Sequence, residues 1–180
     1  MKIPANQAQA VQELLDREAI RDCIYRYCRG IDRCDGAALA SAYWPGATDD
    51  HVFWKGTIEE FVPWVLPILH SRDQTKHSIS NILIRIEGAS AGVESYFDAY
   101  ERAHRKDGRP NDIFVSGRYL DVMERRDGEW RIARRKVVID WFRILDDSAD
   151  WSRGMFGKPL KFGARGSDDP SHELFGTKIA

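Results

Sequence analysis

Cysteine is scarce in this chain and is confined to one short stretch. Cys23, Cys28 and Cys34 are the three cysteines among 180 residues. The five-residue step from Cys23 to Cys28 matches neither the short spacings of zinc ligands nor one face of a helix. We therefore interpret the cysteines as small apolar filler in a reducing compartment, and expect no metal site from them.

The chain also lacks a surplus of charge of one sign and any long apolar run. Its formal net charge is −1, which indicates neither nucleic acid nor a membrane surface as a partner. No apolar run approaches the roughly 20 residues that cross a bilayer, and MKIPANQAQAVQELLD has no apolar signal-peptide core. We expect a cytoplasmic protein.

Several catalytic motifs are missing as well. There is no glycine-rich phosphate loop, no nucleophile elbow and no pair of metal-binding histidines on a helix. The five histidines are scattered along the sequence. These absences favour acid–base chemistry by side chains alone, with no cofactor and no metal.

The first third of the chain carries helical patterns. Apolar residues recur at three- and four-residue steps and predict an amphipathic helix over about Gln7–Arg29. A short helix over Gly36–Tyr43, a short strand near His51–Trp54 and a third helix over Ile58–His70 should follow. Pro67 lies deep enough in the third helix to kink or shorten it.

Long aromatic strand patterns fill the chain up to about residue 145. The four segments are HSISNILIRI, GVESYFDAYERAH, DIFVSGRYLDVMERR and EWRIARRKVVIDWFRI. Glu87-Gly88, Asp107-Gly108 and Asp127-Gly128 supply the turns between them, and Asp127-Gly128 is the clearest hairpin signal. Strands this long should curve strongly. The pattern predicts an α+β roll whose concave face and first helix enclose an apolar pocket.

The composition changes after residue 150. Residues 1–150 are expected to form one domain, and residues 151–180 a glycine-rich, charged tail. The tail should pack on the domain or on a neighbouring subunit through apolar anchors. These anchors are Trp151, Phe156, Phe162, Leu174 and Phe175.

A few polar residues stand out as candidates for chemistry. Asp32 follows the first predicted helix, and Tyr27 lies five residues before Asp32. His77 lies near the start of the first long strand. Each also has a purely structural interpretation, since an aspartate after a helix commonly forms a turn. Arg134 and Arg135 could likewise belong to an exposed ladder of charges.

Three stretches together resemble one family. REAIRDCIYRYCRGIDRCDGAALASAYW, KHSISNILIRIEG and YLDVMERRDGEWRIARRKVVIDWF are similar to the SnoaL-like proteins of the nuclear transport factor 2-like superfamily. The likeness covers about residues 8–145 and is strongest to the branch with scytalone dehydratase, hexachlorocyclohexane dehydrochlorinase and bile-acid dehydratases. It implies a cone-shaped α+β domain with a strongly curved mixed or antiparallel sheet. The fold also hosts isomerases, cyclases and non-enzymes.

The resemblance assigns roles to individual residues. Asp32 in GID and His77 in HSISN fall on the aspartate and histidine that these lyases pair. Tyr27 falls on a tyrosine of the bile-acid dehydratases, and Arg135 lies near an arginine of the dehydrochlorinases. A one-residue slip would select Arg134 instead, because a single step changes the face of the strand.

The chemistry that the resemblance implies is a cofactor-independent elimination on a small hydrophobic substrate, such as a steroid, aromatic or polyketide-like compound. His77 would be the base, Asp32 its partner, and Tyr27 or Arg135 the donor to the departing group or an enolate. Further expected substrate contacts are Tyr96, Asp98, Tyr119, Ile139 and Trp54.

Other functions remain open on the same fold. An isomerase or cyclase would use the same residues. A non-catalytic carrier, or an assembly protein like the small subunit of ring dioxygenases, would have no use for a hydrogen-bonded base. We expect a homo-oligomer, either a dimer or a trimer.

Overall fold

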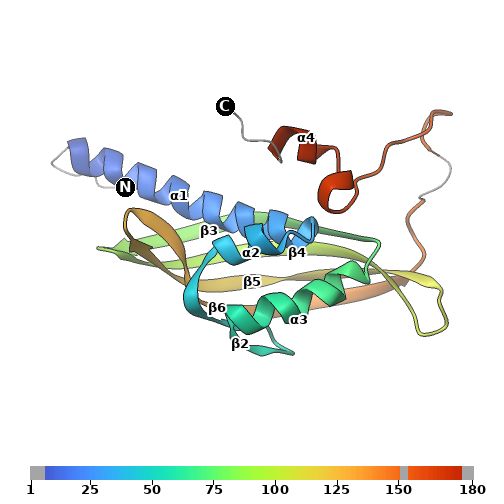
Figure 1. Cartoon of the computed structure of the whole chain (residues 1–180), viewed down its shortest axis with the longest axis horizontal. Helices are drawn as coiled ribbons and strands as arrows, with labels where there is room; N and C mark the ends of the chain where they lie inside the picture. The colour runs from blue at the N-terminus through green and yellow to red at the C-terminus, as the bar shows by residue number, and fades with distance from the viewer. Residues whose placement is uncertain (1–6, 151–153, 176–180) are drawn as a thin grey trace.

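A computed structural model of the chain describes residues 7–150 and 154–175 (Figure 1). The helices are α1 (Gln7–Asp32), α2 (Gly36–Ser41), α3 (Ile58–His70) and α4 (Ser171–Phe175), with a 3-10 turn, η1 (Gly166–Asp168). The strands are β1 (Tyr43–Asp50), β2 (Lys55–Thr57), β3 (Gln74–Glu87), β4 (Ser90–His104), β5 (Pro110–Arg126) and β6 (Glu129–Asp146). Among these residues no helix is both long and apolar enough to cross a membrane.

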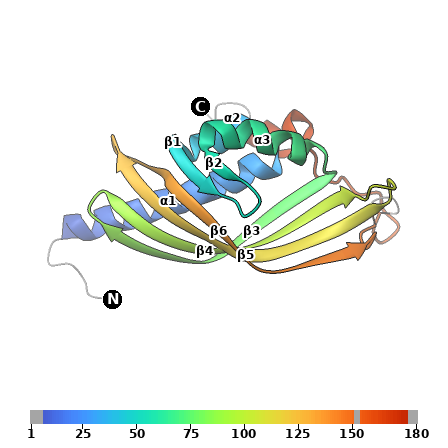
Figure 2. The ribbon, with the colours of Figure 1, turned by 90° about the horizontal axis from the view of Figure 1, so that it is seen from below.

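The six strands form one open, mixed sheet in the order β2-β1-β6-β5-β4-β3. β3 to β6 are joined as antiparallel neighbours, whereas β1 runs parallel to β6. The sheet is strongly bent, and α1, α2 and α3 lie on its concave side (Figure 2). This architecture confirms the expected α+β class with a curved, mixed sheet on N-terminal helices.

The hairpin between β5 and β6 follows from its sequence. Asp127 and Gly128 both have positive φ, at 50° and 84°. Left-handed conformation at both central residues gives the turn a twist that matches the flanking strands. The turn fixes the register in which Arg126 faces Glu129, and with it the faces of the long strands.

Two early elements differ from their predicted positions. The first strand spans Tyr43–Asp50, and the predicted strand at His51–Trp54 is instead the turn that joins β1 to β2. Pro45 and Gly46, which normally break a strand, fall where the register between β1 and β6 shifts. The third helix runs to His70 and is not shortened by Pro67. Buried residues on both sides of the proline, among them Phe61 and Leu69, hold that helix on the core.

The tail packs on the domain mainly through polar groups. Phe156 and Leu174, two of the expected anchors, are 95% and 59% exposed, and Phe162 is half-buried. Trp151 and the side chain of Phe175 lie outside the described residues. Phe156 and Leu174 therefore do not anchor the tail on the domain of the same chain, and their contact with a neighbouring subunit stays a prediction. Hydrogen bonds near the end of α1 hold this segment instead.

Candidate active site

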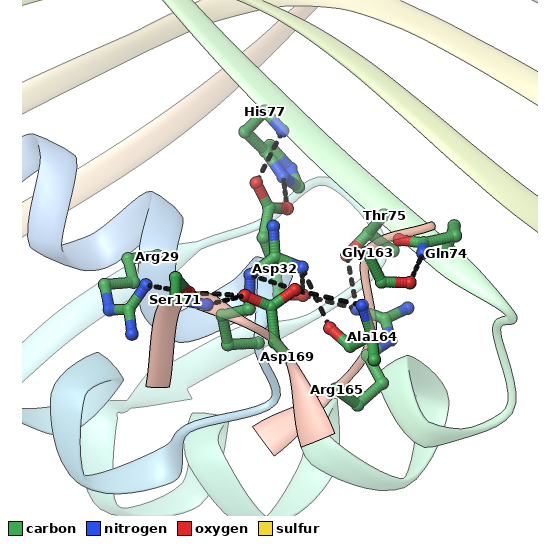
Figure 3. Close-up of polar contacts among 11 residues, drawn as sticks. Arg29, Asp32, Gln74, Thr75, His77, Gly163, Ala164, Arg165, Asp169 and Ser171 are labelled. Atoms are coloured by element: carbon green, nitrogen blue, oxygen red, sulfur yellow. Dashed lines mark hydrogen bonds and ion pairs between the residues drawn. The ribbon is translucent and has the colours of Figure 1, made fainter. Parts of the chain in front are cut away.

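Asp32 and His77 meet where the end of α1 crosses β3. The His77 ring Nδ1 lies 2.7 Å from Asp32 Oδ1, and the His77 backbone amide donates to Asp32 Oδ2 at 2.8 Å. Each side chain is 11% exposed. The last turn of a helix and an edge strand thus hold the two groups rigidly in hydrogen-bond contact (Figure 3).

The surroundings of Asp32 keep it ionised. Burial by itself would raise the pKa of its carboxyl group, but hydrogen bonds from the His77 ring, the His77 amide and the Thr75 hydroxyl lower it. An ionised carboxylate can only accept hydrogen bonds, so Nδ1 must carry the ring proton. A neutral His77 ring therefore has its lone pair on Nε2, which is the state required of a general base.

The inner face of the sheet next to His77 is apolar. The strand register places His77 in a row with Ala99, Val115 and Phe142, from β3 across to β6. The next row on this face contains Ile79, Phe97, Gly117 and Ile139. Phe142 is 67% exposed, so the β6 end of this surface is open.

A second polar cluster, the arginine cluster, lies deeper on the same inner face. Arg135 forms a two-pronged ion pair with Asp121, with Nε–Oδ1 and Nη2–Oδ2 distances of 2.7 and 2.6 Å. Its guanidinium lies 4.1 Å from the ring centres of both Tyr27 and Tyr119. Asp49 of β1 is the strand partner of Arg135 of β6, and it accepts a 2.6 Å hydrogen bond from the Tyr43 hydroxyl.

Burial decides which arginine belongs to this cluster. Arg135 is 1% exposed, whereas Arg134 is exposed on the opposite face of β6. Burial opposes the charge on Arg135, but Asp121 nevertheless holds the arginine pKa well above its usual value. Burial raises the pKa of Tyr27, so its phenol stays neutral.

Aromatic rings connect the two polar groups. The His77 ring centre lies 6.4 Å from that of Phe97, which stacks on Tyr119 at 4.5 Å. Tyr119 meets Tyr27 edge-on at 5.6 Å. The structure thus places Tyr27, Tyr119 and Arg135 together, but separates them from His77 by the Phe97 ring.

Some expected substrate contacts lie elsewhere. Tyr96 and Asp98 point to the outer face of β4, because they alternate with the buried inner residues Ser95 and Phe97. The predicted role of Tyr96 and Asp98 in the pocket is corrected accordingly. Trp54 stacks on Trp64 of α3 at 5.5 Å, and Ile139 occupies the second apolar row.

A hollow of about 710 Å³ lies away from the Asp32–His77 pair. Residues of the outer face, among them the exposed Leu83, Arg85 and Arg134, line much of it. Asp49, Asp121 and Arg135 of the arginine cluster also belong to its lining. Its lining includes neither Asp32 nor His77. Chemistry at the Asp32–His77 pair therefore belongs to the concave side, along the two apolar rows, and not to this hollow.

Three partners of the site, Thr75, Asp121 and Arg165, were not among the predicted site residues. Thr75 precedes His77 by two residues and lies on the same face of β3. Asp121 follows Tyr119 by two residues and lies on the same face of β5. Both follow from strand periodicity once the inner face is known. Arg165 comes from the tail and carries no sequence signal. No group of three or more His, Cys, Asp or Glu residues placed to hold a metal occurs within residues 7–150 and 154–175.

The fold has counterparts among solved structures. A type 2 hexachlorocyclohexane dehydrochlorinase is 19% identical with a TM-score of 0.71, over 81% of this chain and 99% of its own. A candidate scytalone dehydratase from Novosphingobium aromaticivorans is 22% identical with a TM-score of 0.64, over 77% and 96%. The Kfla4162 protein from Kribbella flavida is 18% identical with a TM-score of 0.66, over 73% and 95%. At these identities the likeness concerns the fold.

Curated proteins offer no match to this chain. The SnoaL-like domain, in contrast, matches residues 12–136, which include both members of the Asp32–His77 pair and the arginine cluster. This match spans well over half of the sequence, and the solved structures share the same cone fold. The chain therefore belongs to the SnoaL-like domain family of the nuclear transport factor 2-like superfamily.

Proposed function

We propose that the protein is a cofactor-independent lyase, of dehydratase or dehydrohalogenase type, that acts on a small hydrophobic molecule. The observation that carries the proposal is the 2.7 Å contact between Asp32 and the His77 ring. Lyase-type chemistry also agrees with the dehydrochlorinase and dehydratase among the similar folds.

His77 is the general base of this proposal. Asp32 holds the proton on Nδ1, so Nε2 is free to take a proton from a substrate carbon. The positive charge that develops on the imidazole ring is then stabilised by the Asp32 carboxylate. Within the described residues Nε2 makes no hydrogen bond, which leaves it open to a substrate.

The two apolar rows support a hydrophobic substrate. Val115 and Ile139 are partly exposed, and Phe142 is largely exposed, so apolar surface extends from His77 toward β6. A flat or fused-ring molecule could lie along this surface with its acidic carbon at Nε2. Burial of such a molecule would contribute roughly 25 cal/mol per Å² of apolar area.

Arg135 supplies the electrophilic side of the proposal. Its Nη1 is buried and has no hydrogen-bond partner among the described residues. A buried guanidinium donor without a partner would gain by binding an oxyanion, hydroxide or halide. Phe97 lies between Arg135 and His77, so the departing group would have to reach Nη1 past this ring.

Exchange and elimination assays test the proposal directly. The first probes are hexachlorocyclohexane and scytalone, after the activities for which two similar folds are named, followed by hydroxylated steroids. Deuterium uptake from solvent reports proton abstraction, and product analysis separates elimination from isomerisation or cyclisation. His77→Gln should abolish both signals, and Asp98→Asn, on the outer face, should preserve them. Substrate binding that survives His77→Gln, with no exchange in the wild type, would identify a carrier.

A further inference from the structure

The tail reaches the Asp32–His77 pair through one arginine. Arg165 Nη1 donates to the backbone oxygen of Asp32 at 2.7 Å and to Thr75 Oγ1 at 2.8 Å. Its Nη2 lies 3.4 Å from the Arg72 backbone oxygen. Arg165 therefore bridges the end of α1 and the start of β3, the two elements that carry Asp32 and His77 (Figure 3).

Further bonds dock the segment that carries Arg165, residues 163–171. Arg33 Nη1 donates to the Ala164 oxygen at 3.1 Å, and the Gly166 amide donates to the Arg33 oxygen at 2.9 Å. Arg29 Nη1 donates to the Ser171 hydroxyl at 3.1 Å. Several independent contacts thus fix the backbone on both sides of Arg165.

We propose that Arg165 is a positioning residue for the Asp32–His77 pair and acts on it through the Thr75 hydroxyl. This inference rests on the proposed function, in which Asp32 orients His77 as the base. It gives residues 163–171 a part in the chemistry, because they carry a side chain that orders the hydrogen bonds around the site.

The direction of the hydrogen bonds determines how Arg165 can act on Asp32. A guanidinium group only donates, so Thr75 Oγ1 must accept from Arg165. The single hydroxyl proton of Thr75 is then free to point at the Asp32 carboxylate, where it helps to lower the carboxyl pKa. Arg165 thus donates to Thr75, which leaves the Thr75 hydroxyl proton for the Asp32 carboxylate, and Asp32 accepts from the His77 ring.

Several charged or titratable groups face Asp32. They come from α1, the residues after it, β3 and the tail, and they are Cys28, Arg33, Cys34, His77 and Arg165. Burial raises the pKa values of Cys28 and Cys34, so both thiols are neutral near neutral pH. Arg33 also donates to the Asp32 backbone oxygen, at 3.1 Å, but among the described residues it makes no hydrogen bond to Thr75. Thr75 and Arg165 are therefore the pair to vary.

A purely structural role makes a different forecast. Cations near the last carbonyl groups of a helix stabilise it, and Arg165 could do no more than that at the end of α1. Removal of Arg165 would then lower stability, and any rise in the Asp32 pKa would come from the lost positive charge alone. Such a rise would add to the effect of Thr75→Val instead of overlapping with it. The Ser171→Ala variant provides the matched control, because it removes a tail contact that touches neither Asp32 nor Thr75.

The experiment is a carboxyl-carbon NMR titration of Asp32 in the full chain, which needs no substrate. Arg165→Met should raise the titration midpoint of Asp32, and Thr75→Val should raise it too. The double variant should shift the midpoint no further than the larger single shift. Arg165→Lys, which keeps a donor, should restore part of the shift, and Ser171→Ala should leave the midpoint in place.

Two outcomes would overturn the proposal. One is an unchanged midpoint in Arg165→Met, and the other is a double variant whose shift equals the sum of the single shifts. If Arg165→Met does not fold, Arg165→Lys and Thr75→Val still test the route through the hydroxyl, and an unchanged midpoint in both of them also overturns it. The two proposals can fail separately. If the Asp32 midpoint shifts as expected in a protein that shows no proton exchange on any probe, this inference holds and the lyase proposal fails.

Discussion

The carboxylate of Asp32 accepts one hydrogen bond from the His77 ring at 2.7 Å and a second from the His77 backbone amide at 2.8 Å. A single acidic side chain therefore restrains both the main chain and the side chain of one residue. A ring that is fixed at both points loses little further freedom when it takes up a proton, which is the meaning of preorganisation at this site.

Replacing Asp32 by asparagine should allow the neutral His77 ring to adopt both tautomers. An asparagine amide can offer either its oxygen or its NH₂ group to Nδ1, so the proton is no longer confined to Nδ1. Nitrogen NMR of the ring should show the Nδ1–H form in the wild type and a mixture in Asp32→Asn. Any lyase activity should fall by roughly 10²–10⁴-fold. An unchanged tautomer would argue against this role of Asp32, and Asp98→Asn is the control.

Removing Arg135 alone should strongly destabilise the protein. Arg135→Met leaves the Asp121 carboxylate buried without its partner, at a cost of about 3–5 kcal/mol in the free energy of unfolding. Arg134→Met, one residue away on the exposed face, should change it by less than about 0.5 kcal/mol. The double variant Arg135→Met/Asp121→Leu should recover much of the loss. Urea denaturation measures all three, and equal losses for Arg134 and Arg135 would contradict the assigned faces.

Gly117 should not tolerate alanine. A Cβ at this position would lie 2.2 Å from the Val138 carbonyl oxygen and 2.9 Å from the Phe97 ring. We expect Gly117→Ala to cost about 1–3 kcal/mol and to displace Phe97, the ring next to His77. Gly92 on β4 is the matched control, because its Cβ would meet nothing within 4 Å. Thermal unfolding of both variants checks this, and similar melting temperatures would refute it.

The attachment of the tail should depend on acid pH through Asp169. Burial would raise the pKa of this carboxyl group, but hydrogen bonds from Ser171 and the Ala164 amide, with the Arg33 charge, lower it to about 2 from an ordinary 3.8. A lowered folded-state pKa means that the stabilisation is complete above the unfolded value and is lost as pH falls through the folded one. Wild type should therefore be more stable than Asp169→Asn at pH 5–7, and the difference should shrink between about pH 4 and 2. A difference that persists at pH 2 would contradict this origin.

Much of the fold was predictable because local signals and long-range packing agree. The periodic α1, the boundaries of α3 and the Asp127-Gly128 turn each depend on neighbouring residues. β1 was misplaced because its pairing is parallel and distant, with β6, and its sequence contains Pro45 and Gly46. No local pattern reveals a strand whose position is specified by a distant partner, such as Ile132 for Tyr43.

The candidate site was predictable in part, from the family resemblance and not from local patterns. The family resemblance pointed to Asp32 and His77, which the fold brings together. Tyr96 and Asp98 were misassigned because polar tips on an aromatic strand do not reveal which face they occupy. Arg165 could not be found, because its contact with Thr75 joins residues ninety positions apart.

The hydrogen bond from the His77 backbone amide to the Asp32 carboxylate also bears on solubility. β3 is an edge strand of the sheet, and exposed edge amides can pair with strands of other molecules. Asp32 occupies one of these amides with a charged group from another element. Variants of Asp32 would therefore leave this edge amide unpaired as well as alter the His77 ring. Aggregation should be measured before any loss of activity is attributed to the chemistry.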